Sequence, residues 1–111
     1  MTQPSPADQL RTAAKELRDH VSTTSPAPWA VNQWGNVETA EHEEVAEVWD
    51  LQAGPGNNAA YIALMGPDVG QALAKLLDHE AYRLSVAAPG WKREADPYAL
   101  AVARAITGDT P

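Results

Sequence analysis

Apolar residues near the N-terminus recur every three or four positions, which is the spacing of one face of an α-helix. The members of this stripe are Leu10, Ala13, Ala14, Leu17 and Val21. Ser5 can cap a helix, and Pro6 suits the first helical position because its missing N–H would have no partner there. The pattern predicts a helix over residues 6–21, ended by the polar, proline-containing stretch 22–28.

From Trp29 onward the apolar period changes to about two, which is typical of a strand with one buried face. Gly35 and Asn36 stand where a tight two-residue turn would join two such strands. This turn predicts that Trp34 faces Val37 and that successive pairs alternate between the two faces. One face, the expected core side, then carries Trp29, Val31, Ala40 and His42, and the other, expected to meet solvent or a partner, carries Asn32, Trp34, Val37 and Thr39.

The segment 45–51 fits either a strand or a helix. Its β-branched and aromatic residues favour a strand, although Val45, Val48 and Trp49 also lie at helical spacing. A two-stranded hairpin is marginally stable in water, and a third strand makes a sheet that can cover helices. We therefore expect a third antiparallel strand, followed by a loop at residues 54–56.

The sequence predicts a short helix after this loop, then a break and the start of a second helix. Asn57 or Asn58 can cap a short helix that runs to Met65. Gly66 is expected to end that helix in the left-handed conformation, which glycine adopts without steric cost. Pro67 then begins the next helix.

Two longer helices complete the chain. The first carries an apolar stripe as far as Leu84, and the pair at residues 89–90, proline and glycine, breaks it. Asp96 and Pro97 repeat the combination of cap and proline at the start of the last helix. Gly108 is expected to end this helix.

These elements predict an α+β fold in which a three-stranded antiparallel sheet packs against an N-terminal helix and C-terminal helices. Residues 1–111 are expected to form a single domain, with flexible tails at residues 1–4 and 109–111. The residues expected to share its core are Leu10, Leu17, Trp29, Val31, Ile62, Leu73, Leu76, Leu77, Val102 and Ile106.

Composition narrows the classes of protein that fit. The net charge of −7 disfavours binding to nucleic acid or to anionic lipid, because both require a basic surface. No segment reaches the roughly 20 apolar residues of a membrane span. The N-terminus does not resemble a secretory signal, and there is no cysteine, so we expect a cytoplasmic protein without disulfides.

Three short segments carry a resemblance to a known family. They read TSPAPW at residues 24–29, NAAYIA at residues 58–63 and ALAKLL at residues 72–77. In this order they resemble small early-region accessory proteins of phages and prophages, the lambdoid Ead type, and their actinobacterial relatives. The resemblance covers residues 6–77 and implies a phage or mobile-element setting. The family's biochemical function is unknown, so the resemblance supplies no catalytic residues.

His42, Glu43 and Glu44 are the first candidates for chemistry, because imidazole and carboxylate groups can converge on a divalent cation. A helical zinc motif would need a second histidine four positions after the first, and that position holds Ala46. We therefore interpret this segment as a solvated acidic edge and expect no metal and no cofactor. A small metal-dependent enzyme or regulator that uses His42, Glu43 and Glu44 is an alternative function.

The other polar candidates form no catalytic pattern. His20 and His79 lie at expected helix ends, where a histidine usually interacts with terminal carbonyl groups. The glycines of residues 54–56 lack the lysine of a phosphate-binding loop. No nucleophile motif surrounds Ser22, Ser25 or Ser85. We assign no catalytic residue and expect a non-enzymatic protein.

Residues 38–50 contain six carboxylates and no lysine or arginine. Such a run can mimic a nucleic-acid backbone and dock on a basic partner, which is a further alternative function. Trp34, at the expected hairpin tip, is hard to bury in so small a domain. We expect Trp34, Val37 and Thr39 to form a protein interface. The function predicted is a protein–protein interaction module whose partner is another protein or a second copy in a homodimer.

Overall fold

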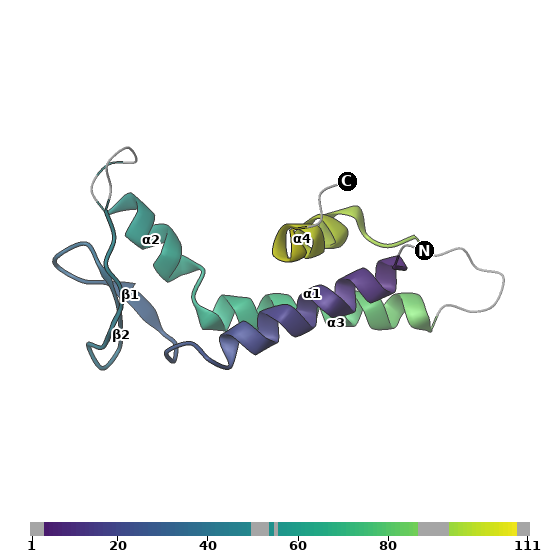
Figure 1. The fold of residues 1–111 in the computed structure, drawn as a ribbon, viewed down its shortest axis with the longest axis horizontal. Helices are drawn as coiled ribbons and strands as arrows, with labels where there is room; N and C mark the ends of the chain where they lie inside the picture. Colours follow the sequence, from purple (N-terminus) through teal and green to yellow (C-terminus); the bar gives the residue numbers. More distant parts are fainter. Residues whose placement is uncertain (1–3, 50–53, 55, 87–93, 109–111) are drawn as a thin grey trace. The chain divides into compact units, whose positions relative to one another are not determined.

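The computed structural model describes residues 4–49, 54, 56–86 and 94–108 (Figure 1). An N-terminal helix is followed by a three-stranded antiparallel sheet and further helices, so the fold is α+β as predicted. The elements are α1 (Pro6–Val21), β1 (Trp29–Val31), β2 (Val37–Thr39), β3 (Glu44–Ala46), α2 (Asn57–Leu64), α3 (Pro67–Ser85) and α4 (Pro97–Thr107).

The chain divides into two compact units. The sheet unit is Thr23–Gly70, and the helical unit combines Met1–Ser22 with Gln71–Pro111. Leu10 and Leu77 belong to the helical unit, whereas Trp29 belongs to the sheet unit, so the residues expected in one core are distributed over both. That residues 1–111 form one domain stays a prediction, and most of the expected tail residues lie outside the described part of the chain.

The helix ends follow the predicted capping residues. Ser5 Oγ accepts a hydrogen bond of 3.1 Å from the backbone N–H of Asp8 at the start of α1. Asp96 Oδ1 accepts from the backbone N–H groups of Tyr98 and Ala99 at the start of α4. Gly108 ends α4 with a φ of 79°, which is the left-handed conformation expected there.

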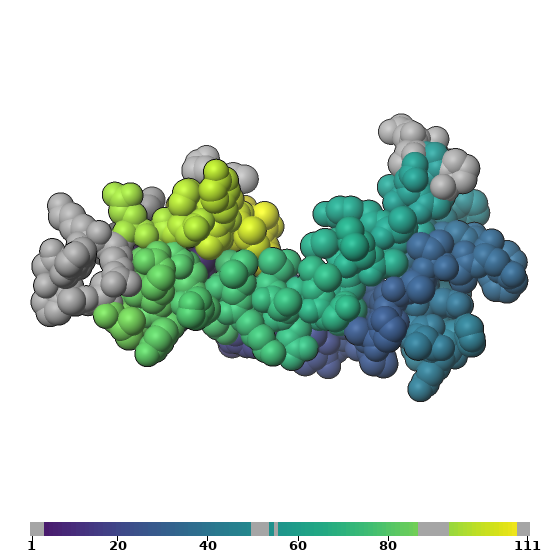
Figure 2. Space-filling view, turned by 180° about the vertical axis from the view of Figure 1, so that it is seen from behind, coloured from purple at the N-terminus to yellow at the C-terminus, as the bar shows by residue number. Residues whose placement is uncertain are grey.

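The core of the helical unit is built mostly from small side chains of α1, α3 and α4. Figure 2 shows the side chains of α4 lying against those of α3. Alanine side chains let helix axes approach closely, and Leu10 and Leu77 fill the remaining volume. The buried residues are Leu10, Ala13, Ala14, Ala74, Leu77, Ala81, Ala99 and Ala103, with Leu17, Leu84, Leu100, Val102 and Ile106 packed against them.

Leu76 was expected in this core, and that prediction is wrong, because the residue is 53% exposed. Leu73 is only partly buried. The inward stripe of α3 runs through Ala74, Leu77 and Ala81, which are spaced by three and four residues. The helices pack through alanines and Leu77, and this orientation leaves Leu76 facing solvent.

Polar side chains join the helices around this core. Arg18 of α1 forms an ion pair with Asp78 of α3. Arg104 Nε of α4 donates a 3.3 Å hydrogen bond to Gln9 Oε1 of α1. These contacts fix the register of the helices along one another.

In the sheet unit the strands lie in the order β1-β2-β3, and α2 packs on β1 and β2. Val37 of β2 and Ala59 of α2 are fully buried. The third strand is confirmed at Glu44–Ala46, which decides for strand over helix at the start of the segment 45–51, whereas residues 47–49 belong to no strand. The end of that segment lies outside the described residues.

The predicted hairpin register is wrong. Val31 pairs with Val37, and Trp29 pairs with Thr39. These four residues therefore share the inner face of the sheet, because side chains directly opposite each other lie on the same face. Ala40 and His42, which were expected on the core side, lie in an exposed loop instead.

The reason for the shift is a three-residue loop in place of the expected two-residue turn. Asn32 and Asn36 form the closing pair, with Asn32 N–H donating to Asn36 O at 2.8 Å. Gly35 N–H donates to Asn32 O at 3.0 Å, and Gly35 has a φ of 77°. A turn followed by a left-handed residue is the usual geometry of a three-residue hairpin loop.

The second hairpin repeats this loop with different residues. Thr39 N–H donates to Glu43 O at 2.9 Å, and His42 N–H donates to Thr39 O at 3.0 Å. His42 occupies the position that Gly35 holds in the first loop, with a φ of 67°. Both hairpins of the sheet therefore use the same loop type, once with glycine and once with histidine at the left-handed position.

The junction between α2 and α3 also differs from the prediction. The residue before α2 is Gly56, which has a φ of 77° and forms no side-chain cap, so neither Asn57 nor Asn58 is the capping residue. Gly66 does not have a positive φ. It is buried, and a Cβ there would lie 3.4 Å from Cδ2 of Trp29. The nearest atom to such a Cβ would be Asp68 Oδ1 at 3.3 Å, so Gly66 lies in a closely packed junction between α2 and α3.

Candidate protein-binding surface

The tip of the first hairpin presents a tryptophan on a firmly held backbone. Trp34 is 73% exposed. The side-chain oxygen of Asn32 accepts hydrogen bonds of 3.0 Å from the backbone N–H groups of both Trp34 and Asn36. These bonds add to those of the loop backbone, so the backbone at Trp34 is held by the loop itself.

An open groove of about 480 Å³ lies beside this tryptophan. Its apolar walls come from Val31, Trp34 and Val48. The backbone N–H of Val48 donates a 2.9 Å hydrogen bond to Asn36 Oδ1, which holds the segment after β3 against the hairpin loop. We call this feature the hairpin groove; its lining residues are Val31, Asn32, Gln33, Trp34, Gly35, Val48 and Gly56.

The three residues predicted to form an interface do not lie together on the surface. Trp34 is exposed as expected, but Val37 is fully buried and Thr39 is only 5% exposed. Thr39 uses its side-chain oxygen to accept a 3.2 Å hydrogen bond from Glu43 N–H. The expectation that Val37 and Thr39 face outward is therefore wrong, and it failed with the predicted register. Whether Trp34 contacts a partner stays a prediction.

The outer face of the sheet is acidic. Glu38 pairs directly with Glu44 on β3 and with Ala30 on β1, so these side chains share the face opposite Val37. Like charges directly opposite one another destabilise a sheet. His42 Nδ1 lies 3.0 Å from Glu38 Oε1, and this hydrogen bond is the main reason why the pKa of Glu38 is lowered.

The net negative charge of the chain comes from the sheet unit. Thr23–Gly70 holds seven acidic residues and no lysine or arginine, and the rest of the chain holds eight residues of each sign. The whole net charge of −7 therefore belongs to the sheet unit. Its acidic residues are Glu38, Glu41, Glu43, Glu44, Glu47, Asp50 and Asp68.

The predicted alternative of a metal site at His42, Glu43 and Glu44 gains no geometric support. Among the described residues, no three histidine or carboxylate side chains converge in a way that could hold a metal ion. His42 instead contacts Glu38, and Glu43 Oε1 accepts a long hydrogen bond of 3.5 Å from Ser25 Oγ.

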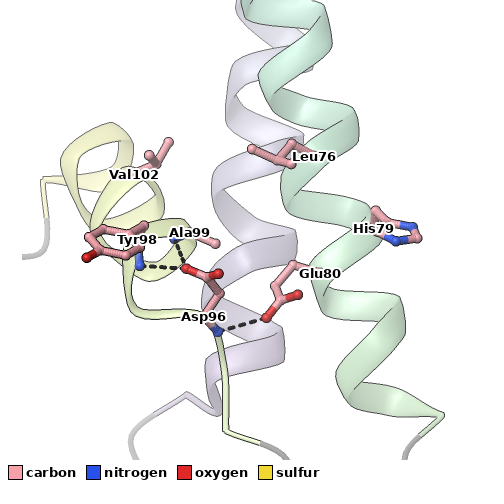
Figure 3. Close-up of a pocket in the computed structure, with 7 residues that line it drawn as sticks. All are labelled: Leu76, His79, Glu80, Asp96, Tyr98, Ala99 and Val102. Carbon is pink, nitrogen blue, oxygen red and sulfur yellow. Dashed lines mark hydrogen bonds between the residues drawn. The ribbon is translucent and has the colours of Figure 1, made fainter.

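A second pocket, of about 220 Å³, lies between α3 and α4 (Figure 3). The His79 side chain points away from Asp96 and Tyr98, so the polar groups do not converge. Asp96 caps α4, and the Glu80 carboxylate accepts a 2.8 Å hydrogen bond from the backbone N–H of Asp96. The residues lining this pocket are Leu76, His79, Glu80, Asp96, Tyr98, Ala99 and Val102.

Glu80 has a structural role in this pocket. Arg83 Nε and Nη2 donate to its two carboxylate oxygens at 2.7 and 2.6 Å, which is a bidentate pair. The hydrogen bonds from Arg83, followed by the one from Asp96 N–H, lower the pKa of Glu80 to about 2. Because Glu80 is only 9% exposed and fully engaged, it braces α3 against the start of α4. The sequence pattern did not single out Glu80 as a candidate, because its partners Arg83 and Asp96 become evident only in the fold.

No family model, curated protein or solved structure matches the chain. Among the described helices, none is long and apolar enough to cross a membrane.

Proposed function

We propose that this protein is a non-enzymatic protein–protein interaction module that binds its partner through the hairpin groove. The observation that carries the proposal is Trp34, which is 73% exposed on a loop fixed by backbone and Asn32 hydrogen bonds. Exposed tryptophans held in a fixed conformation are typical binding anchors, because they offer a large apolar area and lose little entropy on binding.

The groove beside Trp34 supports the same function. Val31 is 40% exposed and Val48 is partly buried, so both can cover an apolar side chain of a partner. The described residues that line the groove include no histidine, serine or carboxylate, which favours a contact surface over a reaction site.

The resemblance of residues 6–77 to Ead-type phage proteins supports a role linked to phages or mobile elements inside the cytoplasm. In such a role the module would act by occupying a surface of another protein. Self-association as a homodimer is the other form that the interaction can take.

The proposal is tested by affinity capture from the native host followed by quantitative mass spectrometry. The bait variants are wild type, Trp34→Ala and the matched control Tyr98→Ala. Tyr98 is an exposed aromatic residue of the helical unit, at 82%, and removing it leaves the hairpin groove intact. We expect a protein that wild type and Tyr98→Ala retain equally and that Trp34→Ala retains at least about tenfold less, as for an interface anchor. If no retained protein depends on Trp34, the proposal is wrong.

A further inference from the structure

We infer, building on the proposed function, that the partner of the hairpin groove is a basic protein segment that places arginine side chains on Trp34 and on the acidic face of the sheet. This acidic face is formed by Glu38 and Glu44, which lie directly opposite each other.

The distribution of charge selects a basic partner. The sheet unit carries the entire net charge of −7 and holds no lysine or arginine that could neutralise it. Two copies that met at this surface would bring two such units together, which electrostatic repulsion opposes. Nucleic acid and anionic lipid would be repelled for the same reason. A basic protein surface is the occupant that this charge attracts.

The pairing of Glu38 with Glu44 is a second, independent observation. Two glutamates in direct register destabilise a sheet. His42 and Asn32 hydrogen-bond Glu38, but the sheet unit holds no lysine or arginine that could neutralise the pair. Positions that break a local rule of stability without a gain in folding are expected at functional sites. A cation from a partner would remove the repulsion between the two glutamates. Its removal would then contribute favourable free energy to binding.

The groove and the acidic face adjoin. Asn32 lines the groove, and its side-chain amide Nδ2 donates a 3.4 Å hydrogen bond to Glu38 Oε2. Asn32 therefore links the rim of the groove to Glu38, and a partner segment that runs along the hairpin can contact Trp34 with one side chain and the acidic face with another.

Arginine fits this pair of features better than lysine does. Its planar guanidinium group stacks on an aromatic ring and donates several hydrogen bonds to carboxylates at the same time. Its aliphatic stem can pack along Val31 and Val48 at the walls of the groove.

Binding of fluorescein-labelled peptides to the full chain tests this inference. The probes are decapeptides of alternating arginine and leucine, lysine and leucine, and glutamate and leucine, measured by fluorescence anisotropy. We expect the arginine peptide to bind most tightly, the lysine peptide more weakly and the glutamate peptide not at all. The affinity of the arginine peptide should fall as the salt concentration rises from about 0.05 to 0.3 M, because screening weakens exposed ion pairs.

Three variants assign the binding to this surface. Trp34→Ala and the double variant Glu38→Gln/Glu44→Gln should each weaken binding of the arginine peptide at least about fivefold, as for loss of an anchor or of the two charges of the acidic face. The control, Glu16→Gln/Glu94→Gln, removes two charges from the helical unit and should change the affinity less than about twofold, because neither carboxylate lines the groove or belongs to the acidic face. Equal weakening by both double variants would overturn the inference.

The outcomes separate this inference from the proposed function. If capture identifies a Trp34-dependent partner with a neutral or acidic surface whose binding does not depend on salt, the interaction module stands and the basic partner is wrong. The same holds if Trp34→Ala dissolves a dimer of the wild-type chain in sedimentation experiments, because the occupant is then a second copy. If neither the peptides nor any captured protein depends on Trp34, both are wrong.

Discussion

Each hairpin loop of the sheet contains one residue in the left-handed conformation, and the side chain at that position affects the stability of the hairpin. Gly35 adopts a φ of 77° without steric cost, because it has no Cβ. His42 adopts a φ of 67° at the equivalent position of the second loop. A residue with a Cβ pays about 1 kcal/mol for this conformation. The contact of its imidazole with Glu38 at 3.0 Å offsets part of that cost.

Substitutions of His42 separate these two effects. His42→Ala keeps the backbone cost and loses the contact with Glu38, whereas His42→Gly loses the contact and also removes the backbone cost. We expect the glycine variant to be the more stable of the two by about 1 kcal/mol in urea unfolding. Equal stability of the two variants would show that the left-handed conformation at His42 costs nothing.

The helices and the strands differ in how far their sequences predict them. The capping residues Ser5 and Asp96 were predicted because a cap depends on hydrogen bonds within three residues. The hairpin register was not predicted, because the loop type depends on a side chain, that of Asn32, which binds two backbone N–H groups of the loop. The pattern of residues 32–35 is compatible with both turns. With the loop at residues 33–35 in place of 35–36, Val37 pairs with Val31 in place of Trp34, and this shift by three positions puts Val37 and Thr39 on the buried face.

The packing of the helices shows a similar limit. A stripe of leucines marks an apolar face, but Ala74 and Ala81 lie at the buried interface of α3, while Leu76 is 53% exposed. Which of two neighbouring stripes faces inward depends on how closely the helices approach, and that distance is a tertiary property. The distance between packed helices cannot be deduced from the periodicity of one helix.

The link between α3 and α4 leads to a prediction about pH. Folding lowers the pKa of Glu80 from its ordinary value of 4.5 to about 2, mainly through the hydrogen bonds from Arg83. The folded state therefore binds this proton less tightly than the unfolded chain does. The resulting stabilisation, at most about 3 kcal/mol, is present above a pH of about 4.5 and is lost as the pH falls toward 2.

Glu80→Gln tests this contribution, because the amide keeps the shape of the side chain but not its charge. We expect the variant to be less stable than wild type by about 1–3 kcal/mol at pH 7, with the difference shrinking toward zero between about pH 4.5 and 2. Urea unfolding across this range measures it. Glu16→Gln, which removes a carboxylate from α1 in the same unit, is the control for general effects of charge. A difference that stayed constant with pH would contradict the lowered pKa.

At the scale of the whole molecule, the net negative charge and the exposed Trp34 belong to the same unit, Thr23–Gly70. The sequence alone located Trp34, because a large apolar residue at a loop tip is hard to bury. It did not locate Val48 as its neighbour, since the side chain of Asn36 brings that segment to the hairpin. The acidic run was evident from the sequence, but its direct pairing of Glu38 with Glu44 required the register of the sheet.

The most direct test of the account measures folding and binding on the same Trp34→Ala protein. Because Trp34 is 73% exposed, we expect its replacement to change the free energy of unfolding by less than about 1 kcal/mol. The same replacement should weaken binding of the purified partner by about 2 kcal/mol or more, while Tyr98→Ala leaves both quantities nearly unchanged. A loss of several kcal/mol of stability with unchanged partner affinity would show that Trp34 serves the fold and not an interface.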